Sequence, residues 1–162
     1  AGVPPGVFAG YDRAEVPAVA DRYFRTIYGR LANGFCWYCE GRLDLSVVSG
    51  EALVDDPAAL AEYPEWYDEL PLASYRCRRC GAEPTADLGT ALADHPAVVS
   101  FYYDRGVDIR EHPQWELVAW HPDRAWVRER DPIRAAVTYT ADGDDLTLVV
   151  DGDCDVVSVE GP

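Results

Sequence analysis

The first third of the chain shows the apolar spacing of a helix with one buried face. Asp12 and Glu15 stand at the separation of a capping box, which marks where a helix begins. The apolar positions that follow recur every three or four residues. They are Ala20, Phe24, Ile27 and Leu31. Asn33 and Gly34 then supply the residue types that commonly end a helix, so the pattern predicts one helix that stops just before the first cysteine.

Two short strands are predicted next, with a long excursion between them. Residues 42–49 alternate, with Leu43, Leu45 and Val47 on one face, and Gly50 closes this strand. Residues 72–76 form the second strand. The excursion over residues 53–71 contains three prolines, so we expect no more than short helical turns there.

The second half changes from a helical pattern to a β pattern at Gly106. Residues 85–106 read as helical from about Leu88, and Pro96 divides them into two segments, the second over residues 96–104. Five strand-length apolar pieces follow. They cover residues 115–120, 125–130, 133–140, 146–150 and 156–160. Asp142 and Gly143 give a hairpin signal between two of them, so we expect one antiparallel meander packed under the helices.

The cysteines form two C-x-x-C pairs separated by 37 residues. Cys36 and Cys39 make the first pair, and Cys77 and Cys80 make the second. Two such pairs are typical of loops whose four thiolates converge on one tetrahedral ion. We therefore predict one structural Zn²⁺ held by these four residues, although iron accepts the same donors. Four sulfurs leave no open position for water, which argues against a catalytic metal.

Glycines and the fifth cysteine refine this prediction. Gly41 and Gly81 follow the second cysteine of each pair closely, where a tight turn requires a positive φ. Two disulfides are one alternative, and they fit a non-secreted protein poorly. A thioredoxin-like redox motif is the other, but it requires a C-x-x-C pair that opens a helix, and neither pair lies at a predicted helix start. Cys154 lies beside three aspartates, which disfavour its thiolate, so we interpret it as a small buried filler.

The predicted fold class is α+β. It consists of a four-cysteine zinc ribbon with flanking helices, followed by an antiparallel β meander. Residues 1–84 hold the N-terminal helix and the ribbon with its inserted loop, and residues 85–162 hold a helix and the antiparallel sheet. We expect the two parts to form one unit, because 162 residues fit a single domain.

The net charge indicates the environment of the protein and says little about its binding partners. The chain has 29 acidic residues against 14 basic ones, all of them arginine, and a net charge of −15. The acidic residues are scattered from Asp12 to Glu160, which favours adaptation to molar salt, where a Debye length of about 3 Å screens their repulsion. We expect a halophilic, cytoplasmic protein. Duplex DNA is a poor ligand for so acidic a surface, and no apolar run is long enough to cross a membrane.

The absence of methionine indicates that the sequence is a piece of a longer protein.

Other residue clusters have two interpretations each. Arginines flank the second cysteine pair, where they either contact an acidic partner or offset the thiolate charge. They are Arg76, Arg78 and Arg79. Aromatic residues of the excursion could bind another protein. They are Tyr63, Trp66 and Tyr67. Tryptophans on the predicted strands could line an effector pocket or belong to the core. They are Trp115, Trp120 and Trp126.

Histidines give no indication of an enzyme. Each of the three precedes a proline, as expected of turns and helix starts, and no recognisable nucleophile motif accompanies them. They are His95, His112 and His121.

The order of several motifs resembles the C-terminal region of haloarchaeal ArsR-type winged-helix transcription regulators. The motifs are CWYCEGRL, YRCRRCGA, HPAVVSFYYDRGVDIREHPQWEL, RERDPIRAAV and DGDDLTLVVDGDCDVVSV, and they extend from about Cys36 to the end. The resemblance implies an accessory domain for dimerisation or effector sensing, in a homodimer that responds to a small molecule. DNA would be read by a domain outside this chain, because the first 35 residues contain one helix rather than three. The alternative is a stand-alone zinc-ribbon adaptor that binds protein.

Overall fold

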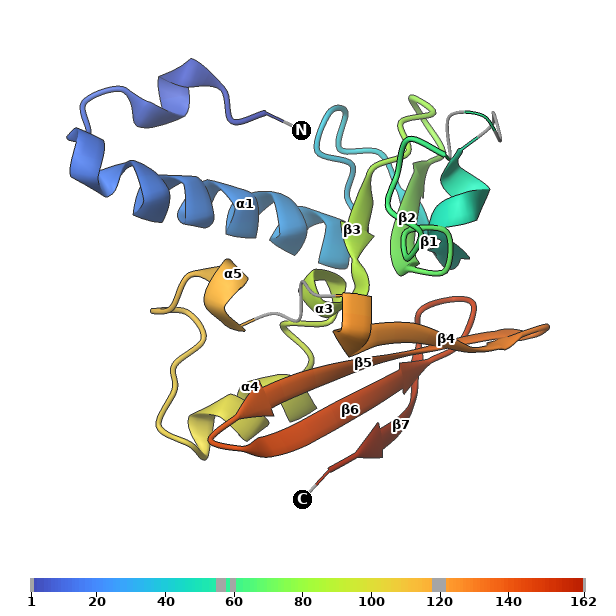
Figure 1. Ribbon diagram of the computed structural model, residues 1–162. Coiled ribbons are helices and arrows are strands. Elements are labelled where there is room, and N and C mark those ends of the chain that lie inside the picture. Colours follow the sequence, from blue (N-terminus) through green and yellow to red (C-terminus); the bar gives the residue numbers. More distant parts are fainter. Residues whose placement is uncertain (1, 55–57, 59–60, 118–121, 162) are drawn as a thin grey trace.

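The computed structural model describes residues 2–54, 58, 61–117 and 122–161, and it places one long helix beside two antiparallel sheets (Figure 1). Helix α1 spans Val16–Ala32 and follows two 3-10 turns, η1 (Pro5–Phe8) and η2 (Arg13–Glu15). The Asp12 amide donates to the Glu15 carboxylate at 2.9 Å, as the capping box requires. At the other end the Gly34 amide donates to the Leu31 carbonyl, and Gly34 has a φ of 77°. Both predicted helix boundaries are confirmed.

The first sheet has three strands in the order β1-β2-β3, namely β1 (Leu43–Ser49), β2 (Pro71–Cys77) and β3 (Thr85–Asp87). β1 and β2 match the predicted strands and pair antiparallel over their whole length. The sequence pattern predicted a helical start near Leu88, where α3 (Leu88–Ala91) begins, but it did not predict that residues 85–87 form a strand. They form β3 because they pair with β2, from Leu72 opposite Asp87 to Ser74 opposite Thr85.

The second sheet is the predicted meander, in the order β4-β5-β6-β7. Its strands are β4 (Ala125–Arg130), β5 (Ile133–Ala141), β6 (Asp144–Val150) and β7 (Val156–Glu160). Asp142 and Gly143 connect β5 to β6 with φ values of 53° and 87°, the left-handed pair of a tight hairpin. The meander and its hairpin are therefore confirmed.

Three short helices and two further 3-10 turns complete the described structure. They are α3 (Leu88–Ala91), α4 (Pro96–Tyr103), α5 (Gln114–Leu117), η3 (Gly50–Leu53) and η4 (Pro122–Arg124). The break at Pro96 is confirmed. The predicted strand over residues 115–120 is wrong where it is described, because residues 115–117 lie in α5, and the rest lies outside the described residues. The Gln114 amide donates to the buried Asp21 carboxylate of α1 at 2.8 Å, which fixes the start of α5.

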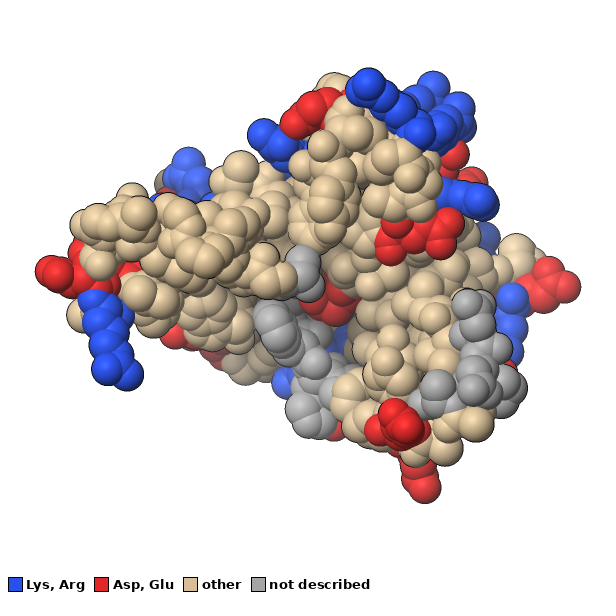
Figure 2. Space-filling view, turned by 90° about the horizontal axis from the view of Figure 1, so that it is seen from above, with Lys and Arg blue, Asp and Glu red and all other residues tan. Residues whose placement is uncertain are grey.

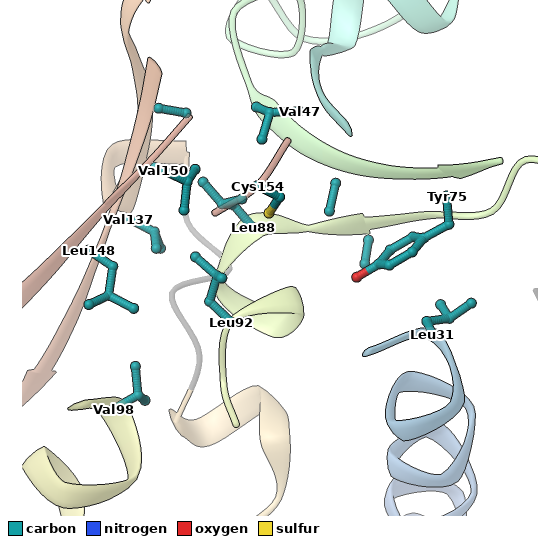
Figure 3. Packing of buried hydrophobic residues seen from close by; sticks show 14 of the residues in the cluster. Leu31, Val47, Tyr75, Leu88, Leu92, Val98, Val137, Leu148, Val150 and Cys154 are labelled. Atoms are coloured by element: carbon teal, nitrogen blue, oxygen red, sulfur yellow. The ribbon is translucent and has the colours of Figure 1, made fainter. Parts of the chain in front are cut away.

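A single cluster of buried side chains joins the two sheets and the helices. Val137 and Leu148 of the meander face Val98 of α4, while Cys154 lies among Val47 of β1 and Leu88 of α3 (Figure 3). The Val47 amide also donates to the Gly152 carbonyl at 2.9 Å, linking β1 to the turn before β7. None of the helices in the described residues has the length and apolar composition needed to cross a membrane.

Candidate metal centre

The four cysteines of the two C-x-x-C pairs meet at one point. Their sulfur atoms all lie within 4.8 Å of one another. The Sγ atoms of Cys36 and Cys80 are 3.7 Å apart, and those of Cys39 and Cys77 are 3.5 Å apart. A tetrahedral Zn²⁺ with Zn–S bonds of about 2.3 Å requires sulfur separations of about 3.8 Å. The donor set therefore fits a four-thiolate ion, and the separations exclude a disulfide, whose bond is about 2.05 Å long.

Two cysteine loops of the same backbone design supply these sulfurs, residues 36–41 and residues 77–82. In each loop the amide of the first cysteine donates to the carbonyl five residues later, at 2.9 Å. The amide four residues later donates back to the carbonyl of the first cysteine, at 3.0 Å. The loops thus approach the sulfur cluster as near copies of each other, although 37 residues separate the two pairs.

The glycines of the two loops have different roles. Gly81 has a φ of 73°, as predicted, but in the first loop the left-handed residue is Glu40, with a φ of 57°. Gly41 is needed for space instead. A Cβ atom there would lie 2.7 Å from the Cβ of Arg79 and 3.1 Å from the Sγ of Cys77. The prediction of a positive φ at Gly41 was therefore wrong, because the glycine serves the close approach of the two loops.

Local hydrogen bonds favour the thiolate unequally within the cluster. The amides of Cys80 and Arg79 donate to the Cys77 Sγ at 3.5 and 3.4 Å and lower the pKa of Cys77 to about 6. The amide of Gly41 likewise favours the Cys39 thiolate, but desolvation and the neighbouring thiols raise the pKa of Cys39 to about 12. Without a metal ion, the closely packed thiols would keep most of their protons. A divalent cation would therefore bind with release of protons.

The cluster lies between the end of α1 and the first sheet. Cys36 and Cys77 are buried, whereas Cys80 is exposed. Arg30 in the last turn of α1 pairs with Glu40 of the first cysteine loop at 2.7 Å. The helix therefore ends beside the cysteine cluster, just before the first cysteine, as the sequence predicted.

The three arginines around the second loop have partners within the chain. Arg78 forms a two-pronged ion pair with Asp44, with Nε 2.9 and 2.8 Å from its two carboxylate oxygens. Arg76 pairs with Glu83 at 3.1 Å, and Arg79 donates to the Cys39 carbonyl at 3.0 Å. These side-chain contacts reach carboxylates and a carbonyl rather than the thiolates, so the choice between offsetting the thiolate charge and contacting an acidic partner stays a prediction. On the face shown in Figure 2, acidic side chains lie in several separate places, and adaptation of the surface to high salt stays a prediction.

The aromatic residues of the excursion form a surface cluster. Tyr63 and Tyr67 stack with ring centroids 4.4 Å apart, and Trp66 meets Tyr67 edge-on at 6.5 Å. Tyr63 and Trp66 are exposed. Their role in binding a partner stays a prediction.

Of the three tryptophans expected on neighbouring strands, the two that the structure describes do not lie on neighbouring strands. Trp115 is in α5, Trp126 is in β4, and both are exposed, while Trp120 lies outside the described residues. The strand pattern around Trp115 misled this prediction.

The remaining candidates have structural roles. His95 is the N-cap of α4, where its Nδ1 accepts from the Ala97 amide at 3.2 Å, and the His112 carbonyl accepts from Arg25. His121 lies outside the described residues. Cys154 is buried, and burial, followed by Asp151 and Asp155, raises its pKa to about 11. Its interpretation as a buried, unreactive filler agrees with this environment.

Comparison with known proteins places the chain in one family. A family model for a domain of unknown function, DUF7351, matches residues 1–156. The chain belongs to this family. Neither the search of curated proteins nor the search of solved structures finds a match. The family match includes all four cysteines and both sheets up to the start of β7.

Proposed function

We propose that this chain is a zinc-stabilised accessory domain of a haloarchaeal DNA-binding transcription regulator. One structural Zn²⁺ is held by the four thiolates of the cysteine loops. The domain serves dimerisation or effector sensing in the cytoplasm, and a separate winged-helix domain reads the DNA.

The observation that carries the metal part is the convergence of four sulfurs within 4.8 Å from two loops with the same hydrogen-bond pattern. Thiolates suit zinc and iron alike. A closed set of four sulfurs suits a structural role, because no position remains for water or substrate. Such sites contribute on the order of 10 kcal/mol to folding.

The regulator part rests on the order of the sequence motifs that resemble ArsR-type regulators. The charge is consistent with it, since a net charge of −15 makes this surface a poor partner for phosphates. DNA contact therefore falls to another domain, and this chain provides contacts with a second copy or with an effector.

Elemental analysis of protein purified in high salt tests the metal part. We expect about one zinc per chain, as one closed tetrahedral site requires, and loss of the ion with loss of folded structure when a strong chelator is added. Circular dichroism in the same buffer follows the fold. A ratio far below one, with no change on chelation, would contradict the site, and iron in place of zinc would correct the metal.

The parent reading frame tests the regulator part. A winged-helix pattern encoded upstream of Ala1 supports it, and an initiator methionine immediately before Ala1 contradicts it. Sedimentation of the purified chain then tests dimerisation directly.

A stand-alone adaptor is the second candidate, and the excursion favours it. Tyr63 and Trp66 are exposed large aromatics in a surface cluster that the core does not require. Replacing both by serine is expected to abolish co-purification of a protein partner without changing the zinc content. Unchanged co-purification would exclude this surface.

A further inference from the structure

A groove of about 670 Å³ lies between α1 and the two cysteine loops. Phe24 and Tyr28 of α1 form one wall, Trp37 and Tyr38 of the first loop form another, and Glu83 follows the second loop at the rim. This volume is within the range of small-molecule sites, which is roughly 300–1,000 Å³. No established role of the fold accounts for it.

The groove is rich in aromatic rings. Trp37 and Tyr38 meet edge-on with centroids 5.2 Å apart, and Phe24 and Tyr28 stack at 6.3 Å. Tyr38 is 73% exposed, so packing in the core does not explain it. The indole Nε1 of Trp37 is buried without a hydrogen-bond partner in the described structure. Aromatic faces of this kind attract a cation that has shed its water.

The charges around the groove select the sign of a ligand. None of the described residues that line it is basic. Glu83 contributes a carboxylate whose partner Arg76 is itself 75% exposed, and exposed pairs of this kind hold each other weakly. The half-buried Asp87 lies close enough that, after burial, it helps to raise the pKa of Tyr28. Glu83 is thus the one charged side chain among the described residues that line the groove, and its sign suits a cation.

We propose that this groove binds an organic cation with an alkylated ammonium group, enclosed by the rings of Trp37 and Tyr38 and neutralised by Glu83. The inference rests on the proposed function in one respect, because it gives the chemical class of effector for a sensing domain. Trp37 and Tyr38 belong to the first cysteine loop and Ala82 ends the second, so the groove depends on the same segments that supply the four sulfurs.

The test compares choline with the neutral alcohol in which a carbon atom replaces the nitrogen. The two probes share size and shape and differ in charge. Each is titrated at constant ionic strength while the indole N–H resonance of Trp37 is followed by NMR. We expect choline to shift this resonance with saturation, and the neutral alcohol to bind at least about tenfold more weakly, as loss of cation–π attraction implies. Equal binding of both probes, or no shift with choline, would overturn the proposal.

Variants locate the site. Tyr38→Ala and Glu83→Gln change exposed side chains and are expected to weaken choline binding by about tenfold and about fivefold, as expected for one aromatic face and one screened charge. The matched control is Tyr103→Ala, because Tyr103 on α4 is 72% exposed and lies outside the groove. Unchanged choline affinity in Tyr38→Ala, or equally weakened affinity in the control, would contradict the proposal.

Zinc content, measured on the same samples, separates this inference from the proposed function. Protein that contains zinc but does not bind choline refutes the groove alone. Protein that binds choline selectively but contains no metal supports the groove and refutes the structural zinc.

Discussion

The cysteine loops and the β4–β7 meander hold their segments together by different means. In the meander, β5 and β6 pair over seven positions, and side chains such as Val137 and Leu148 are fully buried between the sheet and the short helices. At the cysteine loops only Cys36 and Cys77 are buried, and the other two sulfurs are partly or fully exposed. Apolar burial explains the first region, whereas the second brings four sulfurs close enough to hold a metal ion with much less burial.

This contrast matters because the two regions share one core. The Val47 amide bonds to the Gly152 carbonyl, and the buried cluster includes residues of both sheets. A substitution in either region can therefore destabilise the other. Each region must be tested by its own substitution and control, with both regions followed in the same experiment.

The largest effect is expected from Cys77→Ser. If the site binds zinc as proposed, losing one of its four ligands forfeits a large part of a contribution on the order of 10 kcal/mol, comparable to the whole stability of a small domain. We expect metal content to fall and amide protection to disappear in β1 and β2 before β5 and β6, measured by elemental analysis and hydrogen exchange. Cys154→Ala is the control, and it retains the metal. A Cys77→Ser protein with full protection of β1 and β2 would show that burial alone holds both regions.

Leu148→Ala is expected to act on the meander and leave the ion in place. Removing a fully buried leucine costs about 2–5 kcal/mol through lost transfer energy and the cavity left behind. Urea unfolding measures the loss, and Val157→Ala on the exposed side of β7 should change stability by less than about 0.5 kcal/mol. Loss of metal in the Leu148→Ala variant would mean that the meander positions the cysteine loops.

The pH dependence of stability separates Cys154 from the metal cysteines. Burial raises the pKa of Cys154 to about 11 from the ordinary 9.0, so the folded state favours its neutral thiol. This contribution is present below about pH 9 and is lost as pH rises through about 11, and it amounts to about 2–3 kcal/mol.

Unfolding of wild type and Cys154→Ala at pH values on both sides of this window measures it. The stability advantage of wild type over the variant should shrink in alkali. Metal binding shows the opposite sign, since acid protonates the ligand thiolates and releases the ion. A constant difference between the two proteins across the alkaline window would contradict the assignment.

Gly41→Ala is expected to have the smallest effect of the four. Its Cβ would meet the Cβ of Arg79 at 2.7 Å, and forcing the loops apart costs about 1–3 kcal/mol. Competition with a chelator should show weaker metal binding. Gly29→Ala in α1 is the matched control, because nothing lies within 4 Å and alanine favours the helix. Equal metal affinity in both variants would show that the loops tolerate a wider separation.

Patterns among residues close in sequence were sufficient to predict much of the fold. The helical spacing before the first cysteine, the alternation in β1 and the hairpin signal at Asp142 all depend on neighbours in sequence, and all are confirmed. The four cysteines could be assigned to one cluster for a similar reason, since C-x-x-C spacing by itself determines a loop geometry.

The errors depend on partners far away in sequence. Asp21 caps α5 from 93 residues earlier, so the alternation around Trp115 indicated a strand that does not form. β3 exists only because β2 lies beside it. The groove combines α1 with residues that follow the second cysteine pair, and no local pattern can indicate that meeting.

The neck of the excursion has a consequence for the length of the loop beyond it. The Gly50 amide bonds to the Leu70 carbonyl, and the Gly50 Cα lies so close to Tyr67 that no side chain would fit. The segment beyond this neck is a closed loop, and doubling the length of such a loop costs only about 0.6 kcal/mol of chain entropy. We therefore expect changes in the length of this loop to cost little chain entropy while the neck and the paired strands β1 and β2 stay in place.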